Sequence, residues 1–103
     1  MDGYIKIAAT GDVPPNTKRT VRAAGKAFMV ANVGGEFFVS DDTCTHEQCS
    51  LGTEGFLDGT VLICGCHGAT FDVPSGRVLS LPATTDLSIY GVKVQNGEIY
   101  IKA

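Results

Sequence analysis

Hydrophobic and polar residues alternate over short segments, and turn residues separate these segments along the whole chain. Alternation with a period of two is typical of β-strands with one buried face, and no long segment shows a helical period. One helical turn is predicted near residues 46–52. Strands are predicted at 4–10, 17–24, 27–33, 36–40, 60–66, 69–73, 77–81, 87–95 and 98–103.

Three glycine-containing dipeptides lie between these segments and predict tight hairpins: Gly34-Gly35, Asp58-Gly59 and Asn96-Gly97. Short strands at regular spacing favour an all-β fold, an antiparallel sandwich or barrel of hairpins. The 103 residues are near the modal size of one domain, so a single domain over 1–103 is expected.

No stretch is long and apolar enough for a transmembrane helix, and the N-terminus lacks the pattern of a signal peptide. These observations predict a soluble cytoplasmic protein with no membrane partner. In a reducing compartment, the 4 cysteines are expected to serve metal or redox chemistry rather than a disulfide framework.

The formal net charge of −3 argues against nucleic acid as a partner, because phosphate binding needs a basic face. Acidic residues are concentrated between positions 41 and 77, which makes this segment either a solvated surface or a docking face for a basic partner. The basic residues Lys18, Arg19, Arg22 and Lys26 are expected to form a solvated strand face far from it.

All four cysteines and both histidines lie in two short segments, CTHEQC at 44–49 and CGCHGATF at 64–71. Each segment offers one thiolate and one imidazole in close spacing: Cys44 with His46, and Cys64 with His67. A two-iron cluster with two cysteine and two histidine ligands needs this inventory, and so does a zinc site. Common zinc spacing pairs Cys with Cys and His with His, so the alternation here favours a cluster between two loops.

This pattern, C-x-H-x17-C-x-x-H, resembles the signature of the Rieske iron–sulfur family. Gly68, the segment 71–82 and the Leu-Pro-Ala sequence at 81–83 resemble the regions that follow the signature in that family. The resemblance implies a Rieske fold, with a small cluster-binding subdomain at about 43–83 at one end of a β-sandwich. It implies one [2Fe-2S] cluster per chain.

Carried over residue by residue, the resemblance implies that Cys44 and Cys64 bind the inner iron, and that His46 and His67 bind the outer iron. In the Rieske proteins of cytochrome bc complexes, a disulfide ties the two ligand loops together. Cys49 and Cys66 match that pair, which many dioxygenase-type ferredoxins lack. Leu51 and Pro82 are expected to shield the cluster from water.

Two positions point to a subfamily. High-potential Rieske proteins carry a serine and a tyrosine whose hydroxyl groups bond to sulfur, whereas this chain has Ala69 and Phe71. The cluster is therefore expected near the low end of the Rieske range of potentials. The chain looks like the ferredoxin of a bacterial aromatic-ring dioxygenase system, an electron carrier rather than an enzyme. Its implied partners are a flavin-dependent ferredoxin reductase and a terminal Rieske oxygenase, and it is expected to be a monomer.

Three alternatives remain open at this point. The chain could be a high-potential carrier related to quinol-oxidising complexes, which Ala69 and Phe71 disfavour. It could be a zinc-stabilised structural or interaction domain. It could also be a small subunit like those of nitrite reductases, although such subunits often lack the cluster ligands that are present here.

Overall fold

The computed structural model describes residues 3–45, 49–66, 68–81 and 83–102. Within these ranges, eleven strands form three antiparallel sheets, with one short helix and one 3₁₀ turn. The elements are β1 (Tyr4–Ala9), η1 (Thr10–Asp12), β2 (Thr17–Ala23), β3 (Lys26–Val33), β4 (Glu36–Asp41), α1 (Leu51–Glu54), β5 (Phe56–Asp58), β6 (Val61–Ile63), β7 (Thr70–Asp72), β8 (Val78–Ser80), β9 (Ile89–Tyr90), β10 (Val92–Gln95) and β11 (Glu98–Lys102).

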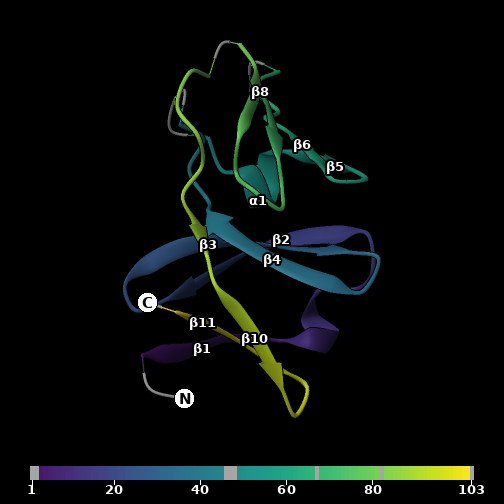
Figure 1. Cartoon of the computed structure of the whole chain (residues 1–103), viewed down its shortest axis with the longest axis vertical. Coiled ribbons are helices and arrows are strands. Elements are labelled where there is room, and N and C mark those ends of the chain that lie inside the picture. The colour runs from purple at the N-terminus through teal and green to yellow at the C-terminus, as the bar shows by residue number, and fades with distance from the viewer. Residues whose placement is uncertain (1–2, 46–48, 67, 82, 103) are drawn as a thin grey trace.

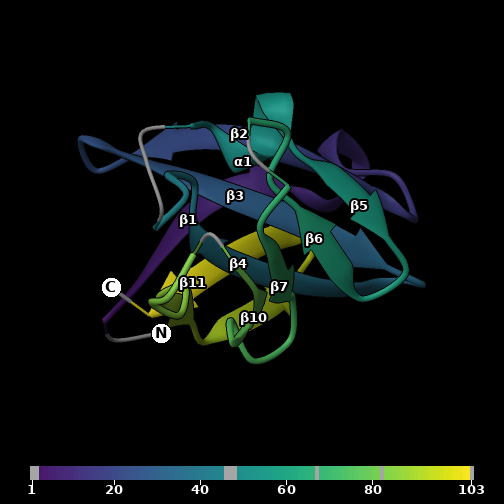
Figure 2. The ribbon, with the colours of Figure 1, turned by 90° about the horizontal axis from the view of Figure 1, so that it is seen from above.

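The sheets are arranged in tiers (Figure 1). A lower sheet has the order β1-β11-β10, a middle sheet has the order β2-β3-β4-β9, and an upper sheet has the order β5-β6-β7-β8. Seen from above, α1 and the strands of the upper sheet lie over the middle sheet (Figure 2). The antiparallel β architecture predicted from the sequence is confirmed.

The core has two parts, and β3 contributes to both. Met29 and Ala31 belong to an upper cluster, whereas Phe28 and Val30 belong to a lower cluster with Ile99. Successive residues of a strand point to opposite faces, so β3 supplies a wall to each cluster. Its near-continuous apolar run reflects burial on both faces rather than one.

Hairpins formed at all three predicted dipeptides, although the turn near Asp58-Gly59 is made by Gly59 and Thr60, because Asp58 pairs with Val61. Asn96 and Gly97 both have positive φ, 53° and 74°, between the paired residues Gln95 and Glu98. A two-residue turn of this kind needs positive φ at both central positions, which Asn and Gly tolerate best. The turn therefore fixes the register of β10 against β11.

The structure corrects the predicted elements in four places. The strand Phe56–Asp58 was not predicted, the segment 60–66 is a strand only over Val61–Ile63, and the segment 87–95 is two strands separated at Gly91. The short helix begins at Leu51, later than expected, and residues 46–48 lie outside the described part. Short edge segments carry too few residues for alternation to define their ends. No helix in the described ranges is long and apolar enough to cross a membrane.

Candidate metal centre

Two loops reach the same end of the molecule, and each is closed by backbone hydrogen bonds. In the first, Thr43 bridges Ser50, and the amide of Cys44 donates to the carbonyl of Cys49 at 2.9 Å. The second joins β6 to β7. Its closing bond runs from the amide of Cys64 to the carbonyl of Ala69 at 2.7 Å. Each loop thus begins with a cysteine whose backbone is fixed.

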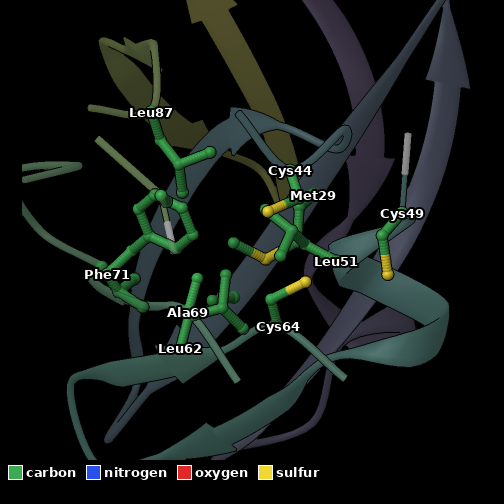
Figure 3. Close-up of a cluster of buried hydrophobic side chains, with 12 residues drawn as sticks. Met29, Cys44, Cys49, Leu51, Leu62, Cys64, Ala69, Phe71 and Leu87 are labelled. Atoms are coloured by element: carbon green, nitrogen blue, oxygen red, sulfur yellow. The ribbon is translucent and has the colours of Figure 1, made fainter. Parts of the chain in front are cut away.

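The side chains of Cys44 and Cys64 are buried, with 3% and 1% of their surface exposed. Both belong to the upper cluster, where Figure 3 shows them beside Met29, Leu51 and Ala69. Neither takes part in the disulfide described below. Two thiols from two loops, shielded from water in one apolar cluster, fit the thiolate half of an iron–sulfur or zinc site.

Three predicted site residues lie outside the described part of the chain: His46, His67 and Pro82. The four-ligand set therefore remains a prediction. Leu51 is fully buried in the upper cluster, in contact range of the same core as Cys44 and Cys64. This position is compatible with the shielding role expected for it.

The remaining cysteines join the two loops. The Sγ atoms of Cys49 and Cys66 form a disulfide with an S–S distance of 2.09 Å and a Cα–Cα distance of 6.5 Å. The Sγ atom of Cys64 lies within 4.8 Å of both sulfur atoms. Because disulfide sulfurs cannot act as thiolate ligands, this three-cysteine group offers a metal only Cys64 while the bond is formed.

A buried carboxylate anchors the first loop to the middle sheet, and the sequence reasoning did not single it out. Asp42 is 4% exposed and accepts three hydrogen bonds: from Thr20 Oγ1 and the Gly52 amide at 2.8 Å each, and from Ser50 Oγ at 2.6 Å. Ser50 also caps α1 by accepting from the Thr53 amide. A buried carboxylate is stable when it is fully hydrogen-bonded in this way. A serine directly before a short helix was the available signal, as a typical N-cap.

The four basic residues of β2 and β3 were expected from the sequence to form a solvated face far from the acidic segment. For two of them, the structure shows otherwise. Lys18 is half-buried, and its Nζ donates to the carbonyl of Gly52 at 2.8 Å. Burial lowers the pKa of Lys18, and the nearby Asp42 carboxylate opposes this effect. Lys26 pairs with Asp41 at 2.8 Å, and this bond raises the pKa of Lys26. Two of the four residues therefore hold segments next to the first loop.

The segment 78–84 carries exposed apolar residues. Leu79 and Leu81 are 53% and 75% exposed, whereas Ala83 is buried in the upper cluster. These residues line a shallow hollow of about 320 Å³. The segment 78–84 thus connects the cluster of buried cysteines to an apolar surface.

These features define a small β protein that can hold a metal centre between two rigid loops at one end. The chain matches the Rieske [2Fe-2S] domain over residues 3–91, and it belongs to that family. The resemblance predicted from the cysteine and histidine spacing is confirmed at the family level.

Relatives of known role are similar over nearly the whole chain. Ferredoxin CarAc of Metapseudomonas resinovorans is 41% identical over 99 residues, covering 95% of this chain and 92% of that protein. The 3-phenylpropionate/cinnamic acid dioxygenase ferredoxin subunit of Shigella flexneri serotype 5b (strain 8401) is 45% identical over 98 residues, covering 94% and 91%.

Solved structures agree. A chain of the complex of reduced oxygenase and oxidized ferredoxin in carbazole 1,9a-dioxygenase has a TM-score of 0.89 and 39% identity, covering 99% of this chain and 94% of that chain. The Sphingomonas yanoikuyae B1 ferredoxin has a TM-score of 0.90 and 31% identity, covering 96% and 97%.

Replacing Asp42 by Asn should weaken the anchor of the first loop, because an amide nitrogen cannot accept the bond that one carboxylate oxygen now accepts. We expect the thermal midpoint to fall on the order of 5–10 °C. Differential scanning calorimetry measures this. Asp58→Asn removes the same charge from the exposed end of β5 and should leave the midpoint nearly unchanged. Equal midpoints for the two variants would contradict the anchoring role.

Replacing Gly65 by Ala should disrupt the second loop, because a Cβ there would collide with the backbone carbonyl oxygen of Glu54. A backbone atom cannot move aside as a flexible side chain can, so a cost on the order of 1–3 kcal/mol is expected. The yield of folded protein and its thermal midpoint measure the effect. Gly11→Ala is the matched control, since nothing lies within 4 Å of its Cβ position. A Gly65→Ala protein as stable as the control would refute the contact.

Proposed function

We propose that the chain is the ferredoxin component of an aromatic-ring dioxygenase system. It carries single electrons from a flavin-dependent ferredoxin reductase to a terminal Rieske oxygenase and is not itself an enzyme. The observation that carries this is the pair of buried cysteines on two closed loops, in a chain similar to dioxygenase ferredoxin components over more than nine-tenths of its length. The proposal includes a monomer that works in the cytoplasm.

One [2Fe-2S] cluster per chain is part of the proposal, with Cys44 and Cys64 on the inner iron and His46 and His67 on the outer iron. When bound, such a cluster accepts and releases one electron. The hydrogen-bonded loop backbones would fix the two thiolates that hold the cluster. Leu51 and Ala69, which are buried beside the two cysteines, would keep water away from them. Pro82, in the segment 78–84, would also shield the cluster from water.

The absence of two hydroxyl groups supports a low potential. Ala69 and Phe71 are fully buried in the same cluster as Cys44 and Cys64, and neither side chain can donate a hydrogen bond. Hydrogen bonds to sulfur are one of the protein's main means of raising a cluster potential. This favours the dioxygenase type over the high-potential type.

The docking surface for the oxygenase is proposed at the segment 78–84. Leu79 and Leu81 expose apolar surface there, beside the buried Ala83. An apolar patch at the end of the molecule that carries the ligand loops suits transient contact between two redox centres. The complex of oxygenase and ferredoxin in carbazole 1,9a-dioxygenase shows that a similar protein forms such a pair.

A redox titration followed by electron paramagnetic resonance tests the proposal. A rhombic Rieske signal with a midpoint near about −150 mV is expected. A signal near roughly +300 mV would instead favour the quinol-oxidising type. A colourless protein that contains zinc would refute the cluster altogether.

Adding the missing hydroxyl groups should raise the potential. In the double variant Ala69→Ser and Phe71→Tyr, donation to sulfur would stabilise the reduced cluster, moving the midpoint upward within the range of roughly −150 to +300 mV. Protein-film voltammetry measures the shift. Ala8→Ser adds a hydroxyl to the lower core cluster and should leave the potential unchanged. No shift in the double variant would mean that these hydroxyls do not reach the sulfur atoms.

Changing a proposed histidine ligand to cysteine should lower the potential or abolish the cluster, because a third thiolate, placed on the outer iron, makes the whole centre more negative. His46→Cys and His67→Cys each test one ligand, by iron and sulfide analysis and by the same titration. A fully loaded cluster with an unchanged potential in either variant would contradict the assignment of that histidine.

A further inference from the structure

The carboxylate of Glu54 lies directly against the disulfide between the two loops. Its Oε2 atom is 3.2 Å from Cys49 Sγ and 3.6 Å from Cys66 Sγ. A disulfide sulfur carries no hydrogen, so neither sulfur can donate to this oxygen while the bond is formed. A negative charge therefore rests beside both sulfur atoms with no compensating hydrogen bond from them.

The position of Glu54 is fixed by its backbone. It is the last residue of α1, its amide donates to the carbonyl of Ser50 at 2.8 Å, and its own carbonyl packs where Gly65 has no side chain. Gly65 immediately precedes Cys66, so the end of the helix rests on the second loop next to the disulfide. The contact is thus built into the way the two loops meet.

The two sulfur atoms differ in their access to solvent. Cys49 is 1% exposed, whereas Cys66 is exposed. We therefore expect a thiolate from solution to approach the disulfide from the side of Cys66. Which sulfur is attacked determines which one must leave with the negative charge.

We propose that Glu54 is a kinetic guard that protects the Cys49–Cys66 disulfide from reduction by thiols. In the first step, a thiolate RS⁻ attacks Cys66 Sγ. A bond forms between R–S and Cys66, the bond between Cys66 and Cys49 breaks, and Cys49 leaves as a thiolate with the electron pair. A second RS⁻ then attacks the mixed disulfide, releasing RSSR and the Cys66 thiolate. Water protonates both protein thiolates, and the disulfide has been reduced by two thiols.

Glu54 opposes the first step in two ways. First, the negative charge of Glu54 repels the incoming thiolate. Second, the same charge lies 3.2 Å from Cys49 Sγ and disfavours the negative charge that develops on that sulfur as it leaves. Thiol exchange slows when the leaving sulfur is a poor anion. The guard slows the opening of a loop-joining disulfide in a medium that contains thiols, and this inference does not depend on the metal or the partners proposed above.

The test is the rate at which reduced glutathione opens the disulfide in the protein as purified. Aliquots are quenched with an alkylating agent and analysed by mass spectrometry with peptide mapping. Glu54→Gln keeps the shape of the side chain and should accelerate opening about three- to fivefold, as expected for removing one partly screened charge. Added salt should accelerate opening of the unmodified protein more than that of Glu54→Gln. Glutathione should be found first on Cys66.

Asp58→Asn is the control, because it removes one charge from the exposed end of β5 and leaves Glu54 unchanged. It should open at the rate of the unmodified protein, and the far-ultraviolet circular dichroism spectrum of each variant verifies that it is folded. Equal rates for Glu54→Gln and the unmodified protein would overturn the proposal. So would equal acceleration by Asp58→Asn, glutathione first on Cys49, or free thiols at both positions in the protein as purified.

Discussion

Burial of β3 on both faces is the constraint on which the rest of the structure depends. One strand must satisfy two cores at once, with Met29 and Ala31 toward the ligand loops and Phe28 and Val30 toward the lower sheet. A strand that is close-packed on both faces moves little, because neither face has free space beside it. The upper sheet and its loops therefore pack on one face of a rigid strand, and the lower sheet packs on its other face.

The two cysteine-containing loops are held by different contacts, which together leave each loop little freedom to move. The first is fixed from below, through the Asp42 carboxylate and the Thr20 hydroxyl of the middle sheet. The second is fixed by its own hairpin and by the carbonyl of Glu54 packed on Gly65. The disulfide then joins loops that other contacts have already placed. In the chain-entropy model, closing a loop of this length contributes about 3 kcal/mol, so it strengthens the arrangement rather than creating it.

Much of this could be predicted from the sequence because its strongest signals are local. Alternation and the turn dipeptides predicted the long strands, and the spacing of cysteine and histidine predicted the family. The strand Phe56–Asp58 could not be predicted, since three residues show no period. The role of Asp42 could not be predicted either, because it depends on Thr20, which is distant in the sequence and becomes a neighbour only when β2 pairs with β3. Its direct neighbour Asp41 looked the same in the sequence, yet it faces Lys26 and Tyr90 instead.

This difference changes the meaning of the acidic segment. Of its six carboxylates, Asp41 pairs with Lys26, Asp42 holds the first loop, and Asp72 accepts from the hydroxyl of Ser75 at 2.6 Å in the turn before β8. Lys26 balances the charge of Asp41, whereas Asp42 and Asp72 accept from neutral hydroxyl and amide groups that fix their positions. Half of the acidic residues in this segment thus have a role within the fold. In the complex proposed with the oxygenase, we therefore expect recognition to depend more on the exposed apolar side chains Leu79 and Leu81 than on net charge.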